Sequence, residues 1–133
     1  MKILMLLGRH ETGKTQAIND VFNKIKNPGD QVTLLSHTGN EDDFEAIITY
    51  NDLKIGFYSA GDLREDIVYA ITHYYHKGCD VLICANSFVR SRGASGWLTR
   101  FSPLQSSVFQ YIDIFPSQDK FSAQDIPDII KKI

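Results

Sequence analysis

Lys2-Ile3-Leu4-Met5-Leu6-Leu7-Gly8-Arg9-His10-Glu11-Thr12-Gly13-Lys14-Thr15 is the segment that predicts the fold most directly. Residues 2–7 form an apolar run that ends at a glycine, which is typical of a buried strand in a parallel sheet. From Thr15 onward the apolar residues recur at spacings of three and four, which predicts a helix with one apolar face. The stripe consists of Ala17, Ile18, Val21, Phe22 and Ile25. Asn27-Pro28-Gly29 should end this helix, because proline cannot continue its hydrogen-bond ladder.

Residues 8–15 match the pattern G-x-x-x-x-G-K-S/T at every fixed position. The two glycines allow the backbone to wrap around a phosphate with its N–H groups pointing inward. Lys14 would reach the outer phosphates, and the Thr15 hydroxyl could bind Mg²⁺. The helix that begins at Lys14 would direct the positive end of its dipole at the same anion. We therefore expect a phosphate-binding loop formed by Gly8, Arg9, His10, Glu11, Thr12, Gly13, Lys14, Thr15 and Gln16.

The rest of the chain alternates strand-like and helix-like segments. Strands are expected at 31–36, 44–50, 53–58, 80–85 and 108–115, and helices after Asp62 and over 125–133. Residues 44–50 and 53–58 are separated only by Asn51-Asp52, which favours a tight antiparallel hairpin. Asp62 and Glu65 resemble a capping box for the second helix. This order predicts one α/β domain spanning residues 1–133, with a mostly parallel sheet and one antiparallel hairpin.

Composition narrows the range of partners. The formal net charge is -2, and no basic stripe indicates a nucleic-acid partner. No apolar run approaches the ~20 residues of a membrane span. The first eight residues are better explained by a buried strand than by a signal peptide, because no cleavage site follows them. Cys79 and Cys84 fit small core residues of a reducing compartment, so a cytoplasmic protein is expected.

A triphosphatase also needs a carboxylate for Mg²⁺, and no strand ends in the expected acid. Asp62 is the candidate, either as the metal's partner with Thr15 or only as a helix cap. The strand at 53–58 should lie beside the strand at 2–7, which would bring Asp62 near Thr15. Arg92 lies in the serine-, glycine- and arginine-rich stretch after residue 86, where a guanidinium could close over the phosphates or could simply be solvated. The predicted catalytic residues are thus Lys14, Asp62 and Arg92.

By this glycine–lysine motif the chain resembles the P-loop NTPases, which implies a three-layer P-loop NTPase-like fold. The order of loop, helix and hairpin followed by Ser59-Ala60-Gly61-Asp62 also looks like a small GTPase. Tyr58, however, stands where the aspartate of its D-x-x-G motif would be, and N-K-x-D is missing. The whole chain is similar to short bacterial P-loop proteins of unassigned function, which share S-A-G-D, I-C-A and R-x-R-G stretches. Here these are residues 59–62, 83–85 and 90–93.

Three functions follow as hypotheses. The first is a Mg²⁺-dependent nucleoside triphosphatase or switch that binds ATP in preference to GTP, in which the polar loop at 37–43, with Thr38, could sense the γ-phosphate. The second is a small-molecule or nucleotide kinase with residues 87–102 as its lid. The third is a module that binds a nucleotide without turning it over. The stretch 86–102 is expected to be the most mobile part and to lie over the phosphates. The sequence identifies no protein partner.

Overall fold

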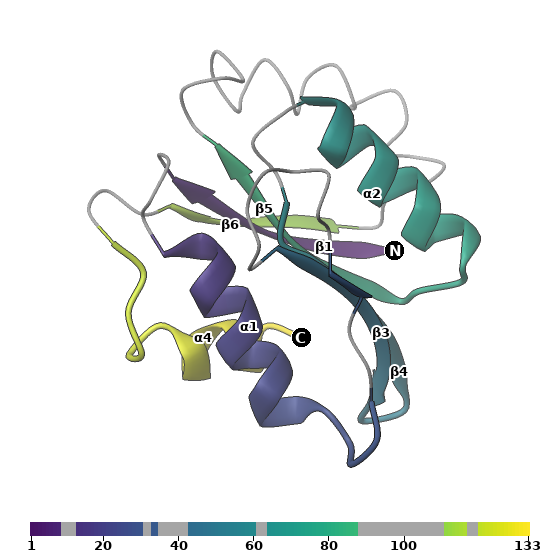
Figure 1. Cartoon of the computed structure of the whole chain (residues 1–133), viewed down its shortest axis with the longest axis horizontal. Coiled ribbons are helices and arrows are strands. Elements are labelled where there is room, and N and C mark those ends of the chain that lie inside the picture. Colours follow the sequence, from purple (N-terminus) through teal and green to yellow (C-terminus); the bar gives the residue numbers. More distant parts are fainter. Residues whose placement is uncertain (9–12, 31–32, 35–42, 61–63, 88–110, 117–119) are drawn as a thin grey trace.

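The computed structural model of the chain describes residues 1–8, 13–30, 33–34, 43–60, 64–87, 111–116 and 120–133 (Figure 1). In these residues the apolar runs form strands and the amphipathic stretches form helices. The elements are β1 (Lys2–Gly8), α1 (Lys14–Ile25), β2 (Thr33–Leu34), β3 (Phe44–Tyr50), β4 (Leu53–Tyr58), α2 (Arg64–His76), β5 (Val81–Ser87), β6 (Tyr111–Pro116) and α4 (Ile126–Lys131).

The described strands form one six-stranded mixed sheet in the order β2-β3-β4-β5-β1-β6. Three neighbouring pairs are parallel, namely β4 with β5, β5 with β1, and β1 with β6. The pairs β2–β3 and β3–β4 are antiparallel. The prediction of an α/β chain with a mostly parallel sheet and an antiparallel hairpin is confirmed. In the hairpin turn, Asn51 and Asp52 have φ values of 49° and 63°, the left-handed backbone that these residue types tolerate.

The predicted neighbour of β1 is wrong. We expected β4 to lie directly beside β1, but β5 lies between them and pairs with both. The three segments at 2–7, 53–58 and 81–85 are all mostly apolar. Their composition therefore does not predict which of them are neighbours in the sheet. The strand order depends instead on how the connecting helices cross the sheet.

Helices lie on both faces of the sheet (Figure 1). On β1, Leu4 and Leu6 point to the face covered by α1 and α4, whereas Ile3 and Met5 point to the face covered by α2. These side chains are all buried, which explains why β1 is apolar at successive positions instead of alternating. Each face therefore has its own core, and the sheet separates the two.

Several predicted boundaries differ from the observed ones. Of the strand expected at 31–36, only Thr33 and Leu34 are described, and they form β2. The last helix is shorter than expected and covers Ile126–Lys131. Asn86 and Ser87, which we placed in the mobile stretch, continue β5. No helix among the described segments is long and apolar enough to cross a membrane.

Polar residues at the start of α1 and immediately before β3 lie at one edge of the sheet. The parallel strands β1, β4 and β5 all end at this edge, and α1 begins there (Figure 1). Because β3 is antiparallel to β4, it starts at the edge where β4 ends. In open α/β sheets, ligands bind outside the carboxyl ends of the strands. The first residues of α1, the start of β3 and the end of β4 are therefore where a site is expected.

Candidate phosphate and metal site

Gly8 and Gly13 frame the loop segment, residues 8–15, as the motif requires. Gly8 ends β1, and Gly13 precedes α1 with φ 82° and ψ 19°, a left-handed backbone. A Cβ atom built on Gly13 would lie 3.2 Å from the backbone oxygen of Phe121. Glycine is thus required at position 13 by its dihedral angles and by the close approach of the C-terminal segment. Residues 9–12, predicted to complete the loop, lie outside the described residues.

Lys14 turns back toward the first glycine of the motif. Its side chain is only 7% exposed, and its Nζ donates a hydrogen bond to the Gly8 carbonyl at 3.0 Å. The ammonium group therefore lies at the carboxyl end of β1. Lys14 also packs, because its aliphatic stem is buried at the first turn of α1.

The first turn of α1 presents a positive end to this place. It contains no acidic residue, and Gly13 at the cap position has no side chain with which to cap the helix. The helix dipole thus favours an anion here. Gln16 contributes no side chain to the helix start, because its Nε2 donates to Asp20 Oδ1 at 2.8 Å, one turn further along.

Thr15 contacts Asp43, which is not one of the predicted site residues. Its Oγ1 donates a hydrogen bond to Asp43 Oδ1 at 3.1 Å. Ser59 Oγ donates to the same oxygen, also at 3.1 Å. Asp43 and Ser59 are each 3% exposed. A buried carboxylate thus joins the first turn of α1 to the open end of the β3–β4 hairpin.

The sequence contains a weak indication that Asp43 belongs to the site. Asp43 is the last residue of the polar stretch at 37–43, immediately before the first arm of the predicted hairpin. In the register of the hairpin, Glu45 lies opposite Tyr58, so Asp43 and Ser59 must be close at its open end. The hairpin prediction alone could therefore have paired Asp43 with Ser59. Nothing local pairs it with Thr15, which is 28 residues away in the chain.

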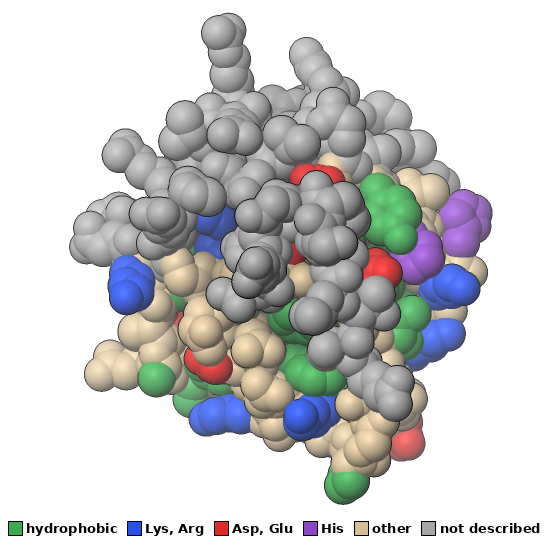
Figure 2. Space-filling model, viewed as in Figure 1, with side chains coloured by type: hydrophobic (Ala, Val, Ile, Leu, Met, Phe, Trp, Pro, Cys, Tyr) green, Lys and Arg blue, Asp and Glu red, His purple; other side chains and the backbone are tan. Residues whose placement is uncertain are grey.

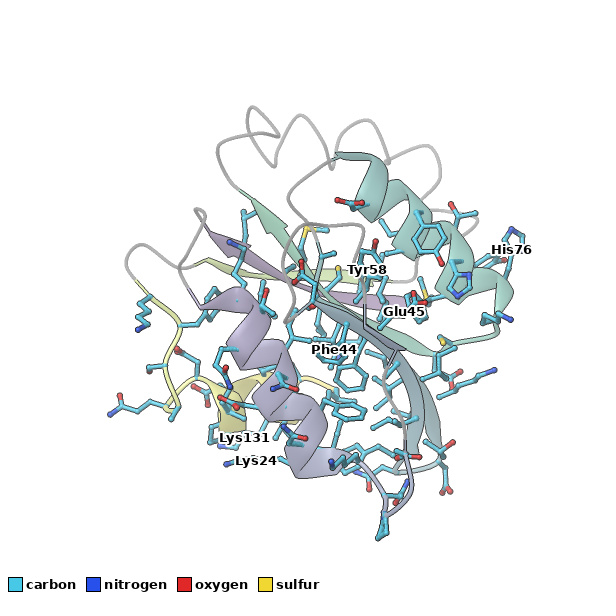
Figure 3. All side chains as sticks on the ribbon, in the orientation of Figure 1. Lys24, Phe44, Glu45, Tyr58, His76 and Lys131 are labelled. Atoms are coloured by element: carbon cyan, nitrogen blue, oxygen red, sulfur yellow. The ribbon has the colours of Figure 1, made fainter. Side chains whose placement is uncertain are left out.

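Tyr58 occupies the end of β4, where the resemblance would place an aspartate. Its side chain is 1% exposed and lies in the core on the α2 side, together with Tyr74. Burial raises the pKa of Tyr58, and the nearby carboxylates of Asp66 and Glu45 raise it further. Figure 3 shows Tyr58 and Glu45 toward α2 and Phe44 toward α1. Tyr58 thus stays neutral and contributes packing on the face away from Thr15.

The remaining predicted site residues belong to segments that the structure does not describe. Asp62 and Arg92 lie outside the described residues, as do Thr38 and residues 88–102 of the lid predicted at 87–102. The histidines drawn in Figure 2 lie over the end of α2, on the other side of the molecule from the start of α1. The described part of the chain contains no group of three or more histidine, cysteine, aspartate or glutamate side chains that could hold a metal. A cation at Thr15 would therefore depend on a single carboxylate and on other oxygens.

Comparisons with protein-family models, with curated proteins and with solved structures found no match to this chain.

Proposed function

We propose that the chain binds a nucleoside triphosphate, ATP in preference to GTP, through residues 8–15. In this proposal the phosphates lie at the start of α1, in a P-loop NTPase-like three-layer fold. The observation that carries the proposal is the position of Lys14, whose ammonium lies at Gly8 at the carboxyl end of β1. The uncapped first turn of α1 adds a second source of positive potential at the same place.

The proposed activity is Mg²⁺-dependent hydrolysis or switching. Lys14 would neutralise charge that develops on the outer phosphates, and the first turn of α1 would hold them in place. Thr15 follows Lys14 in the same turn, and in this proposal its hydroxyl would bind a cation shared with those phosphates. Mg²⁺, if held there by the Thr15 hydroxyl, would supply positive charge that stabilises the phosphate oxygens.

The first test is a panel of ATP, GTP and ADP, each measured with Mg²⁺ and with EDTA by thermal unfolding. A nucleotide at a hundred times its dissociation constant should stabilise the fold by ~2.7 kcal/mol. Lys14→Met should abolish this gain, because methionine keeps most of the buried stem and removes the charge. Lys24→Met is the matched control, since Lys24 is exposed in the last turn of the same helix (Figure 3).

The proposal fails if no nucleotide stabilises the parent chain, or if Lys14→Met binds as the parent does. A second assay separates the kinds of activity that remain. Phosphate release without an acceptor would indicate hydrolysis, and turnover only with an acceptor would indicate a kinase. Binding without turnover would indicate a nucleotide-binding module.

A further inference from the structure

Three side-chain oxygens meet at the open end of the β3–β4 hairpin. Asp43 Oδ1 accepts hydrogen bonds from the hydroxyls of Thr15 and Ser59, each at 3.1 Å. We infer that Asp43 and Thr15 together form the divalent-cation site of this chain, with Ser59 positioning Asp43. This inference rests on the proposed nucleotide binding and names the carboxylate that binding with Mg²⁺ requires.

The spacing of the two oxygens suits one small cation. Mg²⁺ prefers octahedral oxygen ligands at about 2.0–2.1 Å, so two neighbouring ligands of one ion lie about 3.0 Å apart. Thr15 Oγ1 and Asp43 Oδ1 are 3.1 Å apart. The two atoms could become neighbouring ligands with little movement of either side chain. The residues present therefore fit the cation that the motif implies.

Ser59 and the β3 backbone hold Asp43 in position. The Ser59 hydroxyl accepts a hydrogen bond from the Phe44 N–H at 2.9 Å while it donates to Asp43. The Ser59 N–H donates to the Phe44 carbonyl at 3.1 Å. Phe44 is buried against the ring of Phe22 from α1, with 5.6 Å between the centroids. The carboxylate is thus fixed by groups that are themselves packed in the core, which limits the reorganisation needed to bind a cation.

The charge of the site makes cation binding depend on the nucleotide. Mg²⁺ dehydrates reluctantly and is usually held by one or two carboxylates together with substrate phosphates. Asp43 supplies one negative charge, and Thr15 is the residue after Lys14 in the first turn of α1. Phosphates at Lys14 would complete the ligand set from the adjacent position. The cation should therefore bind well only with the nucleotide.

Asp43 also replaces the acid that the end of β4 lacks. Tyr58, at the end of that strand, lies in the core on the α2 side. Asp43 reaches the same edge from the antiparallel partner strand, because β3 begins where β4 ends. Asp43 thus competes directly with Asp62 for the role of metal carboxylate.

The test measures equilibrium binding of a non-hydrolysable ATP analogue with Mg²⁺ and with EDTA, together with Mn²⁺ binding followed by electron paramagnetic resonance. The parent should bind the analogue more tightly with Mg²⁺. Asp43→Asn should keep the parental affinity in EDTA and lose about 10–100-fold of the metal-dependent gain. Asp128→Asn is the matched control and should keep the gain, because Asp128 is exposed on α4. Asp62→Asn tests the competing carboxylate, and it should keep the gain if Asp43 is the metal ligand.

A second pair of variants guards against misfolding of Asp43→Asn. Thr15→Val should lose the metal-dependent gain because it lacks the hydroxyl, whereas Thr15→Ser should keep it. The inference is overturned if Asp43→Asn retains the full gain, or if Asp62→Asn alone loses it. A parent chain that binds no nucleotide in either condition overturns the proposed function as well, so the two failures are distinguishable.

Discussion

At the scale of single residues, Ser59 has two separate roles. Its hydroxyl accepts from the Phe44 N–H, which secures the start of β3, and donates to Asp43, which orients the carboxylate. The first contact belongs to the fold and the second to the proposed cation site. Because Ser59 is only 3% exposed, water cannot easily replace either hydrogen bond.

Ser59→Ala should lower the free energy of unfolding by ~1–3 kcal/mol, the usual cost when a buried hydrogen-bonding group loses its partner. Urea unfolding measures the change. Ser122→Ala is the matched control, because Ser122 is exposed and its hydroxyl lies 3.4 Å from Asp125 Oδ2. That variant should stay within about 0.5 kcal/mol of the parent. Equal and small effects at both serines would contradict the structural role of Ser59.

At the scale of elements, the contact of α2 with the sheet depends on Gly56 in β4. The Tyr74 ring lies over this glycine, and a Cβ atom on Gly56 would lie 2.4 Å from Tyr74 Cδ1. The Tyr74 hydroxyl also donates to the Phe57 carbonyl at 2.7 Å. One aromatic side chain therefore packs on β4 and hydrogen-bonds to it. A side chain on Gly56 would have to push α2 away.

Gly56→Ala should lower the free energy of unfolding by ~1–3 kcal/mol, the range for overpacking in a core. The same substitution in a Tyr74→Ala background should cost less, because the ring that it would clash with is gone. Denaturant unfolding of the four proteins in this cycle measures the coupling. A cost of Gly56→Ala that is the same in both backgrounds would show that the ring does not lie over the glycine.

At the scale of the whole molecule, the sheet divides the interior into two cores, and the core on the α2 side holds titratable groups. Burial raises the pKa of the Cys84 thiol from its ordinary value of 9.0 to about 12. Burial likewise raises the pKa of the Tyr58 and Tyr74 hydroxyls above their ordinary value of 10.0. Each of these groups is therefore neutral in the folded chain at moderately alkaline pH.

These pKa shifts predict that the free energy of unfolding decreases at alkaline pH. The unfolded chain loses the Cys84 proton near pH 9, whereas the folded chain loses it only near pH 12. The contribution of Cys84 to the free energy of unfolding is therefore fully present below pH 9 and is lost as the pH rises toward 12. The loss is at most about 1.4 kcal/mol per pH unit for each such group. The check is unfolding free energy against pH, with Cys84→Ala as the comparison. That variant should show a shallower decline between pH 9 and 12, and an identical decline would contradict the prediction.

β1, the start of α1 and the hairpin could all be predicted from the sequence, because each depends on residues close together in the chain. The apolar run at 2–7 predicts a buried strand, and Asn51-Asp52 tolerate the left-handed turn that joins β3 to β4. The motif at 8–15 likewise predicts a backbone conformation at Gly13 that favours glycine, and the observed φ there is 82°. For these features, local periodicity and backbone preference are sufficient.

The order of the strands and the identity of the carboxylate near Thr15 could not be predicted from the sequence, because both depend on contacts between residues far apart in the chain. β5 separates β4 from β1 although all three strands are mostly apolar, because crossover connections set their order. Asp43 meets Thr15 across 28 residues because β3 runs antiparallel to β4 and so begins at the edge where α1 begins. Long-range pairing of this kind has no period in the sequence, and it brought the carboxylate of Asp43 to the first turn of α1.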